Sequence, residues 1–242
     1  MKVVFISDTH GMHKTVKIPE CDLLIHGGDI THTGELSILQ DFLEWIVEQN
    51  AKNIVFIAGN HDWGFVRRPE DCYALLRDYG FGIQLGQPDG TVREAGLSQY
   101  EGVMYYLQDA GVTIDGVKIY GSPWQPWFCN WAFNLERGEP LRKKWEMIPL
   151  GTDVVVTHGP PAGLGDFCDN MHVGCGDLVE RLEVVNPRYH LCGHIHEGYG
   201  RRSWVGQRTH FLNGAIALGK HHRWQVPPEG GNPPHEFHID AE

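Results

Sequence analysis

The sequence predicts an α/β fold, because short apolar runs typical of buried strands alternate with an amphipathic helix. Lys2 to Ile6 and Asp22 to Ile25 are such runs, and each ends in a polar, Gly-containing turn. Between Gly34 and Asn50, apolar residues recur at spacings of three and four with acidic residues between them, which predicts a helix. A further strand is expected from Asn53 to Ile57. The loops after these strands should gather at one edge of the sheet, where α/β folds usually bind ligands.

The remainder of the chain predicts more strands and one further helix. Residues 80–116 are rich in Gly and polar residues, and we interpret them as an extended excursion with a hairpin around Val112 to Tyr120. The role of residues 80–106 is left open. Residues 153–156, 189–192, 209–212 and 236–239 predict strands, and residues 176–185 predict a helix that Pro187 ends. The sequence contains neither an internal repeat nor a linker, so we predict a single domain over residues 1–242.

Composition narrows the possible partners and the cellular location. The net charge of -11 over 242 residues disfavours long DNA or RNA, because such binding relies on clustered Lys and Arg. A small phosphate ester is compatible with this charge, since bound metal ions would invert the local field. The six cysteines lack any C-x-x-C spacing and are interpreted as reduced thiols. Without a signal peptide or a run of about 20 apolar residues, we expect a cytoplasmic protein with no membrane partner.

Five short polar motifs each follow an apolar run. They are Asp8-Thr9-His10, Gly27-Gly28-Asp29, Gly59-Asn60-His61-Asp62, Thr157-His158-Gly159 and Gly193-His194-Ile195-His196. If strand geometry persists into the motifs, Asp8 with His10, and His194 with His196, each send both side chains to one side. Each motif alone has many innocent occurrences. Together they would bury carboxylates, an amide and imidazoles without partners unless something binds them, so they indicate a metal site.

At these residues the chain resembles the calcineurin-like metallophosphoesterase superfamily, whose pattern is D-x-H, G-D, G-N-H-D/E, a lone H and G-H-x-H. Four further strings are similar to the metallophosphoesterase-domain-containing (MPPED) subfamily: GSPWQPWF at 121–128, THGPP at 157–161, VGC at 173–175 and HEGYG at 196–200. The resemblance implies a sandwich of two mixed β-sheets flanked by helices. It also implies a two-metal site and activity on phosphodiesters, including cyclic nucleotides.

The resemblance implies the metal ligands as well. Asp8, His10 and His196 would hold one ion, and Asn60, His158 and His194 the other, with Asp29 bridging the two. Some animal members of the subfamily have Gly in place of His194, so this chain should bind both ions better than they do. Asp62 stands where close relatives have Glu. Both side chains are carboxylates, so Asp62 can still support the metal site from outside the ligand set.

The chemistry of such a site follows from its donors. Two ions about 3.5 to 4 Å apart lower the pKa of a water and neutralise charge on the phosphoryl group, so the nucleophile would be water and not a side chain. A mixed set of imidazole, carboxylate and amide donors suits Mn, Fe, Zn or Ni better than Mg or Ca, and we favour Mn. We expect His61 to donate a proton to the leaving oxygen, with Asp62 orienting its imidazole.

Three functions are compatible with these motifs. A phosphodiesterase acting on a nucleotide or cyclic nucleotide is favoured. The alternatives are a phosphomonoesterase or phosphoprotein phosphatase with the same metals, and a noncatalytic metal-binding scaffold on the same fold. The motifs do not separate monoesters from diesters, because both reactions need the same ions. The sequence does not indicate an oligomeric state.

Several other residues invite a functional interpretation that we do not favour. The aromatic residues between Trp124 and Phe133 could stack on a nucleobase, but packing of a long loop is preferred. Arg67 and Arg68 are expected to be solvated. The pairs Cys168/Cys175 and Asp166/Asp169 are not expected to bind metal. Surface or structural roles are expected for the C-terminal histidines, His221, His222, His235 and His238.

Overall fold

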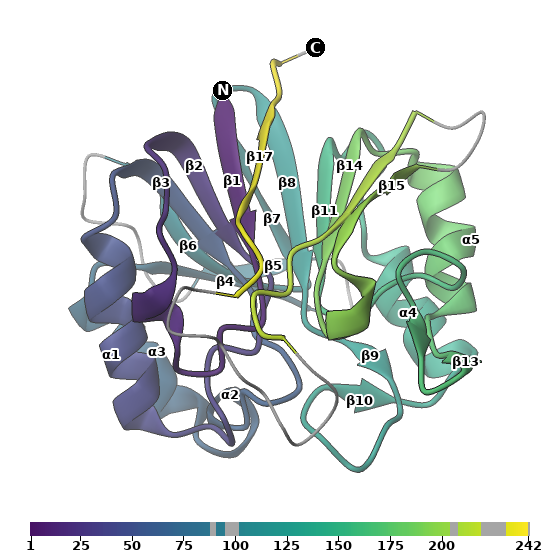
Figure 1. Ribbon diagram of the computed structural model, residues 1–242, viewed down its shortest axis with the longest axis horizontal. Coiled ribbons are helices and arrows are strands. Elements are labelled where there is room, and N and C mark those ends of the chain that lie inside the picture. The colour runs from purple at the N-terminus through teal and green to yellow at the C-terminus, as the bar shows by residue number, and fades with distance from the viewer. Residues whose placement is uncertain (88–90, 95–101, 204–207, 219–230, 242) are drawn as a thin grey trace.

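Two β-sheets face each other, and helices cover the outer side of each, in the computed structural model (Figure 1). The structure describes residues 1–87, 91–94, 102–203, 208–218 and 231–241. This arrangement confirms the predicted sandwich. Among the described residues, no helix combines the length and the apolar character needed to cross a bilayer.

The first sheet has seven strands within the described residues, in the order β17-β1-β2-β3-β6-β4-β5. Its inner strands run parallel, and the edge strands β17 and β5 are antiparallel to their neighbours. The bounds are β1 Lys2–Ile6, β2 Cys21–His26, β3 Ala51–Phe56, β4 Gly82–Gly86, β5 Val92–Glu94, β6 Met104–Gln108 and β17 His235–His238.

The second sheet has six described strands in the order β15-β16-β14-β11-β8-β7, again parallel inside with antiparallel edges. The bounds are β7 Ala110–Ile114, β8 Val117–Ser122, β11 Val154–Thr157, β14 Tyr189–Cys192, β15 Gly200–Ser203 and β16 His210–Asn213. Two short pairs lie outside the sheets: β9 Gln125–Pro126 with β10 Asn134–Leu135, and β12 Phe167–Cys168 with β13 Met171–His172.

The helices lie on the two outer faces, with α1 and α3 on one side and α4 and α5 on the other (Figure 1). Their bounds are α1 Leu36–Val47, α2 Gly64–Arg67, α3 Pro69–Asp78, α4 Glu139–Glu146 and α5 Gly176–Val185, with 3₁₀ turns η1 His13–Thr15 and η2 His196–Gly198. Strand alternation explains the layers. Val3 and Phe5 of β1 belong to the core between the sheets, whereas Val4 and Ile6 pack in the core beneath α1.

Residues 80–116 contain more regular structure than the sequence predicted. The hairpin is confirmed as β7 and β8, but β4 and β6 are buried strands of the first sheet, with β6 between β3 and β4. Ile83 and Tyr106 on these strands are fully buried. The prediction of an irregular excursion was wrong because each strand is short and the intervening sequence is polar. Part of this segment, residues 88–90 and 95–101, lies outside the described residues.

Helices α3 and α4 were missed for a related reason. In α4 only Leu141 and Trp145 are buried, and the other residues are mainly charged, so its apolar stripe is too narrow to stand out. In α3 the buried face includes Cys72 and Tyr73, which are weak helix signals. Of the C-terminal histidines, His235 is buried and its Nε2 lies 2.8 Å from the carbonyl oxygen of Asn213, while His221 and His222 lie outside the described residues.

A buried histidine predicts how stability depends on pH. His190 of β14 is fully buried with Nε2 2.8 Å from the Thr157 hydroxyl, and burial lowers its pKa to about 3. The folded protein therefore keeps this imidazole neutral, whereas the unfolded chain takes up a proton below about pH 6.5. Each such group makes stability fall by about 1.4 kcal/mol per pH unit as the pH drops from 6.5 toward 3.

We expect His190→Gln to flatten that decline, as measured by denaturant unfolding of the metal-free protein at pH 7 and pH 4.5. The same substitution at the exposed His210 is the control and should leave the slope unchanged. An identical difference between the two pH values in wild type and His190→Gln would show that this residue does not couple protonation to folding.

Candidate metal centre

The five polar motifs meet at the carboxyl ends of parallel strands from both sheets, toward the lower edge of Figure 1. Asp8 follows β1, Asp29 follows β2, and His158 follows β11 directly. Asn60 comes after β3, and His194 comes after β14. Side chains from both halves of the sandwich therefore face one buried space between the sheet ends.

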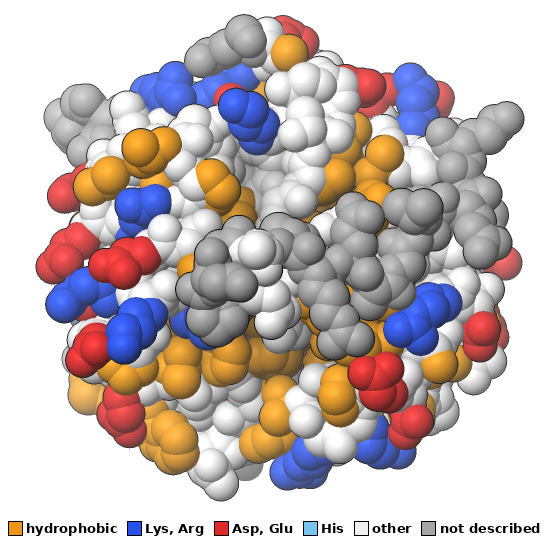
Figure 2. Space-filling model, turned by 180° about the vertical axis from the view of Figure 1, so that it is seen from behind, with side chains coloured by type: hydrophobic (Ala, Val, Ile, Leu, Met, Phe, Trp, Pro, Cys, Tyr) orange, Lys and Arg blue, Asp and Glu red, His pale blue; other side chains and the backbone are white. Residues whose placement is uncertain are grey.

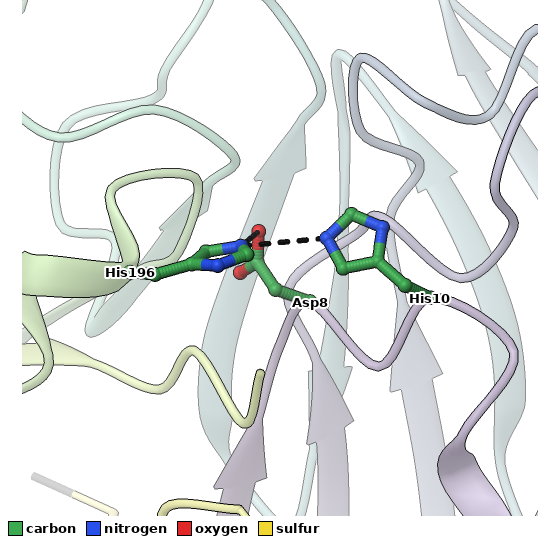
Figure 3. Close-up of side chains that lie close together, drawn as sticks. All are labelled: Asp8, His10 and His196. Atoms are coloured by element: carbon green, nitrogen blue, oxygen red, sulfur yellow. Dashed lines mark hydrogen bonds and ion pairs between the residues drawn. The ribbon is translucent and has the colours of Figure 1, made fainter. Parts of the chain in front are cut away.

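One group consists of Asp8, His10 and His196 (Figure 3). One potential ligand atom from each of the three lies within 4.8 Å of the others. The Nε2 atom of His196 is 3.4 Å from Asp8 Oδ1 and 3.4 Å from Nε2 of His10. Two imidazole nitrogens and a carboxylate oxygen facing one point form a donor set that suits a transition-metal cation.

A second group consists of Asp29, His158 and His194, again with ligand atoms within 4.8 Å. Asn60 joins it, because its Oδ1 lies 2.9 Å from His158 Nε2. The two carboxylate oxygens of Asp29 face different groups. Oδ1 is 3.4 Å from Nε2 of His158, and Oδ2 is 3.8 Å from Nε2 of His10. The carboxylate thus stands between the two groups, and all seven residues predicted as ligands are brought together.

The backbone that presents these side chains differs from the prediction. Asp8, His10, Asp29 and His194 have φ values of 55°, 42°, 57° and 64°, in the left-handed region. Strand geometry ends at Ile6 and Cys192, so the extended alternation expected within Asp8-His10 and His194-His196 does not hold. The side chains converge because the chain turns sharply at each ligand. Such conformations are uncommon for residues with a side chain and gather at functional sites.

Hydrogen bonds at the far side of the rings fix their orientation. Nδ1 of His158 lies 3.0 Å from the carbonyl oxygen of Gly27, and Nδ1 of His10 lies 3.4 Å from that of Thr31. When Nδ1 carries the hydrogen and donates it to a carbonyl, the lone pair of Nε2 points into the centre, which is the arrangement found around ligating histidines.

The electrostatics of the first group favour a charged carboxylate at Asp8 and a neutral imidazole at His10, whereas at His196 the Asp8 carboxylate outweighs burial and raises the pKa. Burial would raise the pKa of Asp8, but the hydrogen bond with His196 and the neighbouring histidines lower it to about 2. Burial lowers the pKa of His10 to about 3, so this ring is neutral at physiological pH. Carboxylate anions and neutral imidazoles are the ligand forms that bind metal.

In the second group, Asp29 and His158 stabilise each other's charge. Burial would raise the pKa of Asp29, yet His158 and His61 hold it well below its usual range. Burial would lower the pKa of His158, but the carboxylate raises it to about 9. The histidine therefore acts as the counter-ion of Asp29 when no cation is bound, and a metal takes over that role.

Asp62 has a different structural role from the predicted one. Its carboxylate accepts hydrogen bonds from the backbone N–H groups of Gly59 (2.8 Å), Ile30 (3.1 Å) and Thr31 (2.9 Å), which flank Asn60 and Asp29. It thereby clamps the two ligand-bearing loops together. The prediction that Asp62 orients the His61 ring was wrong, because Nδ1 of His61 lies 2.6 Å from the carbonyl oxygen of His32.

His61 lies closer to the centre than the sequence indicated. A ring nitrogen of His61 falls within 4.8 Å of potential ligand atoms of His10 and Asp29. The ring centroid is 4.1 Å from that of Trp131 and 4.8 Å from that of His10. Trp131 belongs to the aromatic loop noted in the sequence, but its contact with His61 was not predicted, and the His32 carbonyl was not singled out. Nothing in a single sequence places a distant loop against a given imidazole.

Residues 1–198 match the family model of the calcineurin-like phosphoesterases. The chain belongs to the calcineurin-like phosphoesterase family. The human and mouse proteins named metallophosphoesterase domain-containing protein 1 are each 40% identical to it over 212 residues, which cover 82% of this chain and 61% of theirs. The chain therefore spans about three fifths of the length of these relatives. UPF0046 protein K07C11.7 of Caenorhabditis elegans is 37% identical over 215 residues, covering 89% of this chain and 69% of that protein.

Solved structures agree with this fold. One aligns with a TM-score of 0.62 at 16% identity, covering 88% of this chain and 89% of its own. The protein TT1561 of Thermus thermophilus aligns with a TM-score of 0.54 at 12% identity, covering 88% of each chain. Identities this low establish the fold alone. Family membership confirms the resemblance to metallophosphoesterases, a metal-dependent family that acts on phosphate esters.

Two glycines of this calcineurin-like phosphoesterase allow the close packing of the centre, and they generate a prediction. A Cβ at Gly59 would lie 2.3 Å from Asp29 Oδ1, and one at Gly193 would lie 2.0 Å from Asp8 Oδ2. Either substitution by Ala must displace a carboxylate. We expect Gly59→Ala and Gly193→Ala to weaken Mn binding by roughly 10- to 100-fold, the usual effect of disturbing the support of metal ligands.

Calorimetric titration with Mn measures this effect. Gly176→Ala is the matched control, because a Cβ there meets nothing within 4 Å and its affinity should remain that of wild type. Wild-type Mn affinity in both site variants would mean that the two carboxylates do not hold the ion.

Proposed function

We propose that this protein is a two-metal phosphodiesterase that hydrolyses a small phosphate diester, with a nucleotide or cyclic nucleotide as the favoured substrate. The position of Asp29 carries the proposal, because its two oxygens face two separate groups of potential ligands. A carboxylate shared between paired sites would hold two ions close together, as two-metal hydrolysis needs. Asp8, His10 and His196 are the proposed ligands of one ion, and Asn60, His158 and His194 those of the other.

Mn is the proposed metal, with Fe, Zn and Ni as alternatives. Imidazole nitrogens form most of the donor set, and this supports a transition metal over Mg or Ca. When bound, the two ions activate a water and neutralise negative charge on the phosphoryl oxygens.

His61 is the proposed proton donor to the leaving oxygen. Its Nδ1 is held by the His32 carbonyl, so Nε2 is the nitrogen that can carry the mobile proton. Trp131 packs against the ring and shields one side of it from water. The backbone N–H of His61 also donates to Asp29 Oδ1 at 2.8 Å, which ties the proton donor to the proposed bridging carboxylate. Asp62 acts indirectly by clamping the loops that carry Asn60 and Asp29.

Surface charge supports a small substrate and no long nucleic acid. On the face shown in Figure 2, the described Lys and Arg side chains are dispersed among Asp and Glu and do not form a continuous basic stripe. The net charge of -11 has the same implication. We also propose a cytoplasmic location, supported by the six cysteines, all of which are free thiols.

Metal content provides the first test of this function. We expect about two transition-metal ions per wild-type chain by elemental analysis. Asp29→Ala should abolish activity and lower the metal content of both sites, because the lost carboxylate offsets the charge of both ions. His194→Gly should weaken one site only, so its reduced activity should recover in part at high Mn.

A folded wild-type chain that stays metal-free at saturating Mn would support the noncatalytic scaffold instead. If high Mn restores Asp29→Ala as well as it restores His194→Gly, Asp29 belongs to a single site and does not bridge.

The choice of leaving group tests the role of His61. A nucleoside alkoxide leaves poorly without a proton, so His61→Ala should slow hydrolysis of a nucleotide diester by roughly a hundredfold to ten-thousandfold. Bis-p-nitrophenyl phosphate releases a stable phenolate and should be affected much less. Kinetic assays of both esters, with metal content measured in parallel, make the comparison.

Two results would revise the role of His61, and a third would revise the type of reaction. Equal slowing of both esters with loss of an ion would make His61 a ligand, as its closeness to His10 and Asp29 allows. Equal slowing with both ions retained would give it a role in substrate binding. Faster hydrolysis of phosphate monoesters than of any diester by wild type would replace the phosphodiesterase with a phosphomonoesterase.

A further inference from the structure

A cavity of about 170 Å³ adjoins the second ligand group at His194. Its lining is mainly apolar and includes two aromatic rings. The principal wall residues are Trp127, Phe128, Pro160, Met171, Val173 and His194. This volume fits an organic group of about the size of an aromatic ring, and walls of this kind favour apolar or aromatic groups over charged ones.

One wall is a loop braced by hydrogen bonds. The backbone N–H of Trp127 donates to the Leu135 carbonyl at 2.9 Å, and the side-chain amide of Asn134 donates to the Phe128 carbonyl at 2.7 Å. The backbone turns through left-handed conformations immediately after Phe128, at residues 129 and 130. The Phe128 side chain therefore projects from a supported turn, although it is 36% exposed.

The opposite wall is the hairpin formed by β12 and β13. The Arg137 guanidinium reaches across from beyond β10 and donates to the carbonyls of Val173 and Gly174, each at 2.7 Å. These bonds hold the two walls together, so the cavity exists without a ligand. Arg137 and Asp169, which carry opposite charges, both line the cavity. Because the remaining walls are mainly apolar, the cavity is suited to an uncharged occupant.

The loop that forms the first wall contacts both ends of the metal centre. The Phe128 ring lies 6.3 Å from the His194 ring, measured between centroids. Trp131, three residues later, packs on His61 at 4.1 Å. The cavity adjoins the His158 and His194 group, whereas His61 adjoins the His10 group. His61 is not among the residues that line the cavity, so a leaving group that takes its proton from His61 does not need to occupy it.

We propose that this cavity binds the ester group that stays on phosphorus, and that it selects substrates in which this retained group is a planar aromatic ring. The proposal rests on the proposed hydrolysis. In that step, a water oxygen bonds to phosphorus and the leaving ester bond breaks with its electron pair. The leaving oxygen takes a proton from His61, which the attacking water replaces. The retained ester bond stays intact, so its group can remain in the cavity throughout.

Two esters with the same leaving group isolate the retained group. Phenyl p-nitrophenyl phosphate and methyl p-nitrophenyl phosphate both release p-nitrophenolate and differ in the retained group that would occupy the cavity, while the wall variants separate binding of this group from its effect on intrinsic reactivity. For the Mn-loaded wild-type protein, we expect kcat/KM to favour the phenyl ester by roughly tenfold or more. Phe128→Ala and Met171→Ala, on opposite walls, should bring this ratio toward one by slowing the phenyl ester more than the methyl ester. Leu150→Ala, an exposed apolar residue outside the cavity lining, is the control and should keep the wild-type ratio.

Other outcomes overturn the assignment. A wild-type phenyl-to-methyl ratio that persists in both wall variants would show that the cavity does not bind the retained group. Equal slowing of both esters in the wall variants would place the leaving group in the cavity instead.

A binding measurement separates failure of this proposal from failure of the proposed function. Calorimetric titration of the Mn-loaded protein with phenylphosphonate and methylphosphonate needs no catalysis. Tighter binding of phenylphosphonate, lost in Phe128→Ala, supports the cavity even if wild type hydrolyses neither diester, in which case only the function is rejected. Equal affinity for the two phosphonates in wild type would reject the cavity even if both esters are hydrolysed.

Discussion

The buried carboxylate of Asp29 is the interaction on which the rest of the centre depends. An ionised carboxylate away from water costs several kcal/mol unless it is paired and hydrogen-bonded. Here the backbone N–H of His61 donates to it, and the His158 ring lies 3.4 Å away. Gly59 lets the neighbouring loop approach within a distance that any side chain would prevent. Asp29 comes from the first sheet and His158 from the second, so stabilising this charge requires the two sheet edges to meet.

The two sheets support the centre in similar ways. In the first sheet, the Thr9 hydroxyl lies 3.0 Å from Nε2 of the buried His26, at the ends of β1 and β2. In the second, Thr157 and His190 form an equivalent pair at 2.8 Å, on β11 and β14. In each pair, the Thr directly precedes a proposed ligand, and its partner His belongs to the neighbouring strand. Buried polar contacts inside each sheet and contacts between the sheets thus fix the proposed ligands. Together they restrict how far the ligand side chains can move relative to one another.

The residue pattern predicts an α/β fold and the meeting of the motifs, and the family resemblance implies the sandwich, but neither predicts the geometry of the motifs. Parallel strands place their carboxyl ends at one edge, so polar residues after successive apolar runs were bound to converge. The left-handed turns at Asp8 and His194 could not be foreseen, because they arise from contacts between distant loops and break the strand period. Asp62 was misassigned for the same reason: its backbone partners include Thr31, which is 31 residues away in the chain. Helix α4 and strand β6 escaped detection because their apolar patterns are short and are completed only by tertiary packing.

The left-handed backbone conformations of the proposed ligands suggest that binding of a cation stabilises the folded protein. Each such conformation at a residue with a side chain costs about 1 kcal/mol or more, and four of the seven proposed ligands adopt it. The negative charge of Asp29 also repels that of Asp8 and raises the pKa of Asp8, against the larger influence of the histidines. Without a cation, the Asp62 clamp and the pairing of Asp29 with His158 support this arrangement. A bound cation offsets the repulsion between the carboxylates and adds bonds to the strained residues, so it stabilises the folded state selectively. The backbone of the ligands is therefore already arranged for a cation, and this arrangement lowers the stability of the metal-free protein.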